Sequence, residues 1–161
     1  MEYMPNFQIH RPTTTIEAVK LSSEKPMVKF VAGGTDIIVN VRRGIEQPKN
    51  LIDLSSIVEL KEIKENADSI QIGAGVTLKE LAGNNLIKNN YPAIAEAASS
   101  VAGGTHQHYG TLGGNLCLDT RCLFYNQSEW WRQSNDYCMK ERGEICHVAP
   151  GGKRCFAAFS G

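Results

Sequence analysis

Short apolar segments alternate with polar turns over residues 1–116, and this pattern predicts a compact α/β unit. Residues 28–32, VKFVA, are apolar at every position except Lys29 and predict a buried strand. After a Gly-Gly turn, residues 37–44, IIVNVRRG, end in two arginines and a glycine, which is a helix C-terminal signal. Residues 50–54, NLIDL, predict a second strand. Strand, helix and strand in this order predict a βαβ unit with parallel strands.

The remaining apolar periodicity in this part of the chain predicts short helices and one hairpin. A helix is expected over residues 16–21, where threonines precede the apolar positions, and an alanine-rich helix over residues 91–102. Residues 60–64 and 69–73 flank an Asn-Ala-Asp turn and predict an antiparallel hairpin. The stretch TLKELAG begins at Thr77 with a glutamate at capping-box spacing, which predicts another helix start.

The pattern changes after residue 102. Residues 103–115, GGTHQHYGTLGGN, hold five glycines and almost no apolar side chains, so loops are expected there. Residues 123–159 show little periodicity at all. A structureless stretch of this length is unusual in a compact domain unless something other than a hydrophobic core orders it. A bound metal cluster would supply that order.

Composition narrows the class of protein. The chain has 161 residues, 42% hydrophobic and 21% charged, with a formal net charge of zero, so a soluble domain with no attraction to nucleic acid or membrane is expected. The start, MEYMPNFQIHRP, lacks the features of a secretory signal, which predicts a cytoplasmic protein. All five cysteines lie at or after Cys117. Their odd number argues against a disulfide framework, and clustered reduced thiols are typical ligands of soft metals, although no CxxC is present.

Two glycine-containing loops are candidates for an anion site. Residues 32–36, AGGTD, follow a predicted strand, and residues 111–115, TLGGN, follow the long glycine-rich stretch. Glycine allows the backbone to approach a phosphate closely, and free amides at a helix start attract negative charge. Each loop is a weak signal by itself, because many Gly-Gly pairs are only turns. Two loops in one small domain would suit a diphosphate held between them.

Residues 1–119 resemble the FAD-binding medium subunit of the molybdenum hydroxylase, or xanthine dehydrogenase, family. The resemblance lies in the AGGTD loop, in the stretch ASSVAGGTHQHYGTLGGNL and in the distance between the two loops along the chain. The cysteine-bearing segment, with NLCLDTRCLFYNQ and the later Cys138, Cys146 and Cys155, is similar to the β subunit of 4-hydroxybenzoyl-CoA reductase, a member with an extra [4Fe–4S] cluster. The resemblance implies an α+β fold: an FAD-binding PCMH-type domain with a cysteine-rich loop insertion. The implied ranges are 1–55 for a βαβ subdomain, 56–119 for an incomplete second subdomain and 120–161 for the insertion.

The resemblance also implies cofactor contacts for individual residues. The cluster ligands would be Cys122, Cys138, Cys146 and Cys155, with Cys117 a buried residue that is not a ligand. No catalytic residue is expected. The implied FAD contacts are Lys29, Phe30, Val31, Ala32, Gly33, Gly34, Thr35, Asp36, Val101, Thr111, Leu112, Gly113, Gly114 and Asn115.

The function that the resemblance implies is electron transfer between a [4Fe–4S] cluster and FAD in an oxidoreductase subunit that is inactive alone. The partners would be a large molybdenum-cofactor subunit, a small [2Fe–2S] subunit and an external ferredoxin, with electrons entering at the cluster for anaerobic reductive dehydroxylation of 4-hydroxybenzoyl-CoA in aromatic degradation. An alternative within the family is an FAD subunit of a xanthine dehydrogenase-like hydroxylase, with the flow reversed. An alternative of another class is a zinc-stabilised, non-catalytic binding module. Relatives continue beyond the length of this chain, so about half a subunit is expected.

Overall fold

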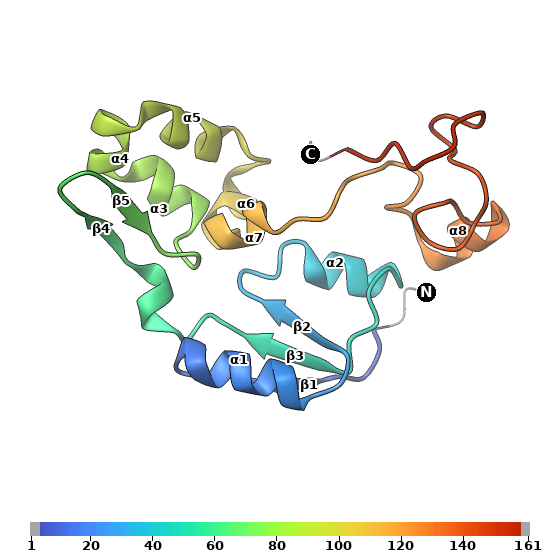
Figure 1. The fold of residues 1–161 in the computed structure, drawn as a ribbon, viewed down its shortest axis with the longest axis horizontal. Helices are drawn as coiled ribbons and strands as arrows, with labels where there is room; N and C mark the ends of the chain where they lie inside the picture. Colours follow the sequence, from blue (N-terminus) through green and yellow to red (C-terminus); the bar gives the residue numbers. More distant parts are fainter. Residues whose placement is uncertain (1–3, 159–161) are drawn as a thin grey trace. The chain divides into compact units, whose positions relative to one another are not determined.

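A computed structural model describes residues 4–158 and divides the chain into two compact units. The sheet unit contains residues 6–35 and 48–117, and the cysteine unit contains Asp36–Gln47 together with the segment from Leu118 onward. The ribbon and its elements are drawn in Figure 1. This division groups Asp36–Gln47 with the cysteine-bearing segment rather than with its neighbours in sequence. The subdomain ranges 1–55, 56–119 and 120–161 remain predictions.

A three-stranded parallel sheet forms one part of the sheet unit. Its order is β1 (Gln8–His10), β3 (Asn50–Asp53) and β2 (Val28–Val31), so that β3 is central. Lys29 pairs with Leu51, and the parallel register confirms the predicted strands and their pairing. The prediction that the first of these strands is buried was wrong, because β2 is an edge strand on which Lys29 and Phe30 are exposed. The three residues of β1 are too few to show a periodicity, and this strand was not predicted.

Helix α1 (Thr15–Glu24) confirms the first predicted helix. The hydroxyl of Thr14 accepts a hydrogen bond from the backbone N–H of Glu17 at 3.2 Å, as expected of an N-cap. Ala18 is buried against Ile52 and Ile57, and these three residues form the smaller of the two hydrophobic clusters.

The second part of the sheet unit is a hairpin with three helices. After a 3-10 turn, η1 (Val58–Lys61), strands β4 (Ile63–Glu65) and β5 (Ile70–Ile72) pair antiparallel, which confirms the predicted hairpin. The larger hydrophobic cluster consists of Val76, Leu78, Leu81, Ile87, Ala95 and Ala98. These residues come from the segment before α3 and from α3 (Leu78–Gly83), α4 (Asn85–Asn90) and α5 (Pro92–Ser100).

The glycine-rich stretch is more ordered than the sequence indicates. It contains α6 (Gly104–Tyr109) and α7 (Leu112–Leu116), so the prediction of loops was wrong for these residues. Tertiary hydrogen bonds outweigh the low helix propensity of glycine here. The backbone N–H of Leu112 donates to the carbonyl of Val76 at 2.8 Å, and the N–H of Gly113 donates to the carbonyl of Ala74 at 2.8 Å.

The cysteine unit contains α2 (Ile37–Arg42) and α8 (Glu129–Ser134). Helix α2 confirms the prediction made from its C-terminal arginines, and Gly44 follows with a φ of +71°, a conformation that favours glycine. The other described residues after 117 are mostly irregular, as their lack of periodicity predicts. No helix within residues 4–158 has the length and apolar character needed to cross a membrane.

The capping box of α3 provides a stability test. The hydroxyl of Thr77 accepts from the backbone N–H of Glu80 at 3.2 Å, and the Glu80 carboxylate accepts from the Thr77 N–H at 2.9 Å. We expect Thr77→Ala to lower the free energy of unfolding by about 1 kcal/mol and Thr77→Ser to preserve it.

The same pair has a pH dependence with a definite sign. Hydrogen bonds from the backbone and side chain of Thr77 lower the pKa of Glu80 below its ordinary value of 4.5. A depressed pKa in the folded state stabilises the protein above the ordinary value and ceases to do so as the pH falls through the lower one. The difference between wild type and Thr77→Ala in thermal unfolding should therefore shrink below about pH 4.5. Since the backbone N–H at position 77 remains in Thr77→Ala, a difference independent of pH would show that the Thr77 hydroxyl does not stabilise the carboxylate.

Candidate functional site

The first glycine loop lies at the carboxyl end of an edge strand. The predicted flavin contacts Lys29, Phe30 and Val31 lie in β2, and residues 32–35 follow directly. The backbone N–H groups of Gly33, Gly34 and Thr35 donate no hydrogen bond to any residue within 4–158. Ligands of open parallel sheets bind beyond the carboxyl ends of the strands, and unused amides suit an anion. The loop therefore fits a diphosphate.

Within the sheet unit, Gly33 and Thr35 of the first loop lie against the two residues that directly precede the second loop. A Cβ atom added to Gly33 would lie 1.7 Å from the carbonyl oxygen of Tyr109, two residues before the second loop. A Cβ atom added to Gly110 would lie 3.6 Å from the hydroxyl of Thr35. The structure thus places together two segments that the sequence only suggested as partners.

The second loop uses its amides internally. Besides the bonds of Leu112 and Gly113, the N–H of Gly114 donates to the hydroxyl of buried Thr111 at 3.1 Å, and the N–H of Asn115 donates to the Thr111 carbonyl at 3.0 Å. The expectation that both loops present free amides is therefore met only by the first. Gly114 itself is exposed, so its surface is open to a ligand.

Val101 is a predicted contact with a structural role of its own. Its side chain packs against the larger hydrophobic cluster, and its carbonyl accepts from Nε2 of Gln107 at 3.0 Å. Gln107 also donates to the carbonyl of Ser99 at 2.8 Å, so this glutamine ties the end of α5 to α6.

The structure distributes the cysteines over both units. Cys117 lies in the sheet unit and is exposed, contrary to the expectation that it is buried. The predicted ligands lie in the cysteine unit, where Cys138 and Cys146 are buried, Cys122 is partly buried and Cys155 is exposed. Within the described residues, no three His, Cys, Asp or Glu side chains group closely enough to hold a metal ion.

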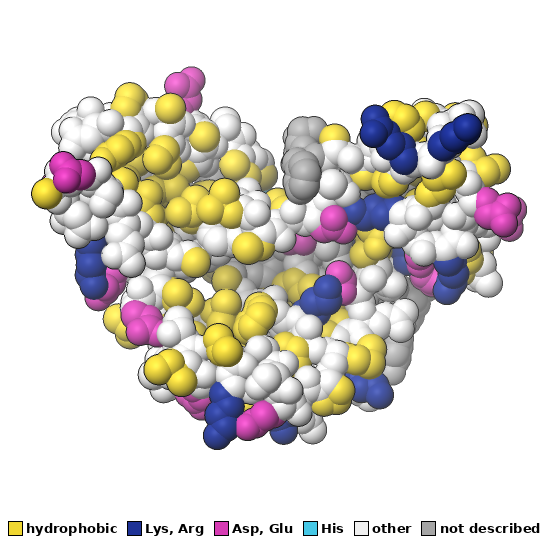
Figure 2. All heavy atoms as spheres, viewed as in Figure 1, with side chains coloured by type: hydrophobic (Ala, Val, Ile, Leu, Met, Phe, Trp, Pro, Cys, Tyr) yellow, Lys and Arg dark blue, Asp and Glu magenta, His cyan; other side chains and the backbone are white. Residues whose placement is uncertain are grey.

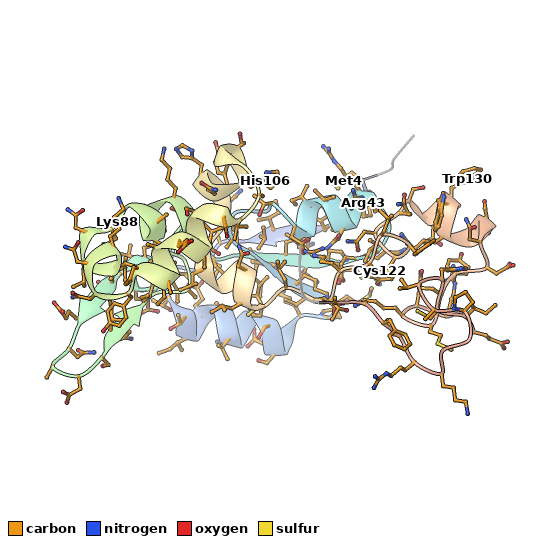
Figure 3. All side chains as sticks on the ribbon, turned by 90° about the horizontal axis from the view of Figure 1, so that it is seen from above. Met4, Arg43, Lys88, His106, Cys122 and Trp130 are labelled. Carbon is orange, nitrogen blue, oxygen red and sulfur yellow. The ribbon has the colours of Figure 1, made fainter. Side chains whose placement is uncertain are left out.

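Backbone pairings nevertheless organise the segments that carry these thiols. Arg121, next to Cys122, pairs antiparallel with Ala158, and the N–H of Met139, next to Cys138, donates to the carbonyl of Ile145 at 3.1 Å. The labelled Cys122 lies on the irregular segment after α7 in Figure 3.

The surroundings of Cys146 favour a thiolate. The nearby backbone N–H groups of Ala149, Phe156 and Val148 lower the pKa of the Cys146 thiol below its ordinary value of 9.0, although burial opposes this. The N–H of Ala157 donates to Sγ of Cys155 at 3.4 Å. Hydrogen bonds to sulfur are among the features that set the potential of iron–sulfur clusters, so these donors fit an anionic ligand sulfur.

A buried arginine, which the sequence does not single out, is the centre of the cysteine unit. Arg132 in α8 is 1% exposed. Its guanidinium donates to the carboxylates of Glu141 at 2.9 Å and Glu129 at 2.6 Å, and to the carbonyl of Arg43 at 3.1 Å. It also donates to the carbonyl of Gln127. This network connects α8 with the end of α2 and with Glu141 through side-chain hydrogen bonds, a source of order that the sequence analysis did not predict.

Sequence comparison identifies the class of domain that carries these loops. The family described as the FAD binding domain in molybdopterin dehydrogenase matches residues 5–130. The chain belongs to this family, and the fold class predicted from the resemblance is confirmed.

Individual relatives agree with this assignment. The xanthine dehydrogenase FAD-binding subunit of Escherichia coli O157:H7 is 32% identical over 109 residues, which cover 67% of this chain and 37% of that protein. The aldehyde oxidoreductase FAD-binding subunit of E. coli K12 is 31% identical over 152 residues, 94% of this chain and 46% of that protein. The second similarity therefore extends into the cysteine-bearing segment. The chain spans less than half the length of these relatives.

Solved structures show the same fold. Carbon monoxide dehydrogenase from Hydrogenophaga pseudoflava superposes with a TM-score of 0.68 at 31% identity, covering 71% of this chain and 40% of that chain. These relatives are named as dehydrogenases or oxidoreductases, so they favour the xanthine dehydrogenase-like alternative. The narrower resemblance to 4-hydroxybenzoyl-CoA reductase receives no support from them.

Proposed function

We propose that this chain is the FAD-binding part of an electron-transfer subunit in a xanthine dehydrogenase-like molybdenum hydroxylase. The observation that supports this most directly is the first glycine loop, whose three consecutive N–H groups are unused and whose Gly33 touches the segment before the second loop. Flavin supplies the exchange of one and two electrons when it is bound. The residues of this chain bind and orient it: Gly33, Gly34 and Thr35 through their amides, and the second loop through its exposed Gly114.

The same proposal assigns Cys122, Cys138, Cys146 and Cys155 to a [4Fe–4S] cluster. Four thiolates are the usual ligand set of such a cluster. The hydrogen bond from the N–H of Ala157 to the sulfur of Cys155 and the lowered pKa of Cys146 support this assignment, because both favour anionic sulfur. The similarity of the aldehyde oxidoreductase subunit across 94% of the chain is consistent with a shared segment of this kind.

The partners proposed are a large molybdenum-cofactor subunit and a small [2Fe–2S] subunit, in a cytoplasmic complex. Large apolar side chains support a role inside a larger assembly: Leu116 is 77% exposed, Leu123 is 78% exposed and Trp130 is 73% exposed. Trp130 projects outward from α8 in Figure 3, and hydrophobic patches are visible among charged side chains on the surface in Figure 2.

In a hydroxylase, electrons would leave through FAD. A narrower alternative is reductive dehydroxylation of 4-hydroxybenzoyl-CoA, with ferredoxin as donor and electrons entering at the cluster. Only the cysteine-bearing segment favours it. The two directions are distinguished by assaying the assembled complex with reduced ferredoxin and with NAD⁺. Turnover driven by reduced ferredoxin alone would support the reductase, and substrate oxidation coupled to NAD⁺ would support the hydroxylase.

The cofactor assignment predicts the metal content of two cysteine variants. In the full protein that carries this chain, purified without oxygen, Cys138→Ser should lose the iron and Cys117→Ser should keep it, with FAD measured in both by its visible absorption. Zinc in place of iron and flavin would support the zinc-stabilised module instead. Equal loss of iron from both variants would contradict the proposed ligand set.

A further inference from the structure

Two arginines of the cysteine-bearing segment hold the two ends of α2. At the start of the helix, Nη2 of Arg121 is ion-paired with the carboxylate of Asp36. At its end, Nη1 of Arg132 donates to the carbonyl of Arg43 at 3.1 Å. All four residues belong to the cysteine unit. Asp36 is also the last residue of the first glycine loop. The ion pair with Arg121 therefore involves a residue that is covalently part of the predicted flavin site.

Asp36 does not perform the function that its position suggests. An aspartate at an N-cap ordinarily accepts a hydrogen bond from a backbone N–H of the first turn. Here its side chain makes no such bond and the residue has a φ of −111° and a ψ of −57°. Its carboxylate is instead shared between Arg121 and Nδ2 of Asn40, which donates at 3.0 Å. The position of this carboxylate is therefore determined by the cysteine-bearing segment as well as by α2.

Arg121 is held in place by backbone contacts with a distant part of the same segment. Its backbone pairs in both directions with Ala158, and the N–H of Ala158 donates to its carbonyl at 3.0 Å. Two residues before it, Asp119 pairs with Lys140 at 2.8 Å. The residues that hold the Arg121 backbone and the neighbouring Asp119 thus lie about 40 and about 20 positions further along the chain, so these contacts require an ordered segment.

We propose that Arg121 is a positioning residue that couples the order of the cysteine-bearing segment to FAD affinity, through Asp36. This rests on the proposed function, since the first glycine loop must bind FAD. When the segment is ordered, Arg121 holds Asp36 and with it the end of the loop whose amides face the ligand. When the segment is disordered, the loop loses this restraint and must be ordered by the ligand itself. The coupling is reciprocal, so bound FAD stabilises the segment.

The test uses the full protein with Arg121→Gln, Arg121→Lys and, as a matched control, Arg154→Gln. Arg154 is an exposed arginine of the same segment that stacks on Phe156. FAD affinity is measured by titration of the apoprotein with flavin fluorescence, and order by the rate of limited proteolysis after residue 117. We expect Arg121→Gln to weaken FAD binding roughly 5- to 150-fold. Arg121→Lys should restore most of the affinity, and Arg154→Gln should bind like wild type.

Two further results distinguish coupling from a simple loss of positive charge. FAD should slow proteolysis of the segment in wild type but not in Arg121→Gln. Asp36→Asn should weaken binding as well, and adding Arg121→Gln to it should cause little further loss, because both act through one pair. Additive losses, or unchanged affinity in Arg121→Gln, would overturn the coupling while wild-type binding of FAD leaves the proposed function intact. A wild-type protein that binds no FAD would overturn the proposed function and the coupling together.

Discussion

Replacing Arg132 by methionine is expected to unfold the cysteine unit at a much lower urea concentration than in the wild type. The side chain is 1% exposed and serves two carboxylates and two backbone carbonyls. Removing one member of a buried ion pair leaves its partners without compensation, and the usual cost is about 3–5 kcal/mol. Glu129 and Glu141 are partly exposed and regain some hydration, so we expect a loss of about 3 kcal/mol.

Arg142→Met is the matched control for this prediction. Arg142 pairs with the same Glu129, at 3.0 Å, but it is an exposed side chain. Exposed ion pairs are screened by water and contribute little, and the contact of the Arg142 guanidinium with the Tyr137 ring, 3.6 Å to the centroid, adds only a small stabilisation at an exposed site, so this variant should lose much less stability than Arg132→Met. Both tryptophans of the chain, Trp130 and Trp131, lie in α8, so their fluorescence reports on the cysteine unit directly. Equal midpoints for the two variants would show that the buried network does not stabilise this unit.

Gly33→Ala should have the second large effect, on both stability and flavin binding. The added methyl group would overlap the carbonyl oxygen of Tyr109, which is part of the backbone and cannot rotate away. The two segments must separate, and overpacking of this kind costs about 1–3 kcal/mol or more. Separation also displaces the first glycine loop from the second. The variant should therefore bind less FAD per chain than the wild type, as measured by visible flavin absorption.

The control is Gly83→Ala, at the last residue of α3. A Cβ atom there would meet no atom within 4 Å. Alanine is the better helix former, so this variant should be as stable as wild type or more stable by up to about 1 kcal/mol. It should also retain FAD. If Gly33→Ala keeps both its melting temperature and its flavin, the close approach of the two loops is not what forms the site.

The sequence by itself determined most elements whose signals are local. Short segments rich in apolar residues predicted β2 and β3 as two parallel strands, although only the central β3 is buried and the edge strand β2 is partly exposed. The capping box at Thr77 and the arginines before Gly44 marked helix ends, because capping depends only on residues within one turn. The glycine motifs also suggested the family, since backbone approach to phosphate requires particular residues at particular positions.

Only the tertiary structure decided which segments meet. Nothing in TLGGN indicated a helix, but carbonyls of Ala74 and Val76 accept its amides and order α7. The role of Arg132 was equally hidden, since a lone arginine in a segment without periodicity is usually solvated, and its partners include a carbonyl 89 residues away. The pairing of Arg121 with Asp36 spans 85 residues. Such contacts depend on how distant segments pack, which local propensity does not encode, and they link the cysteine-bearing segment to the start of α2.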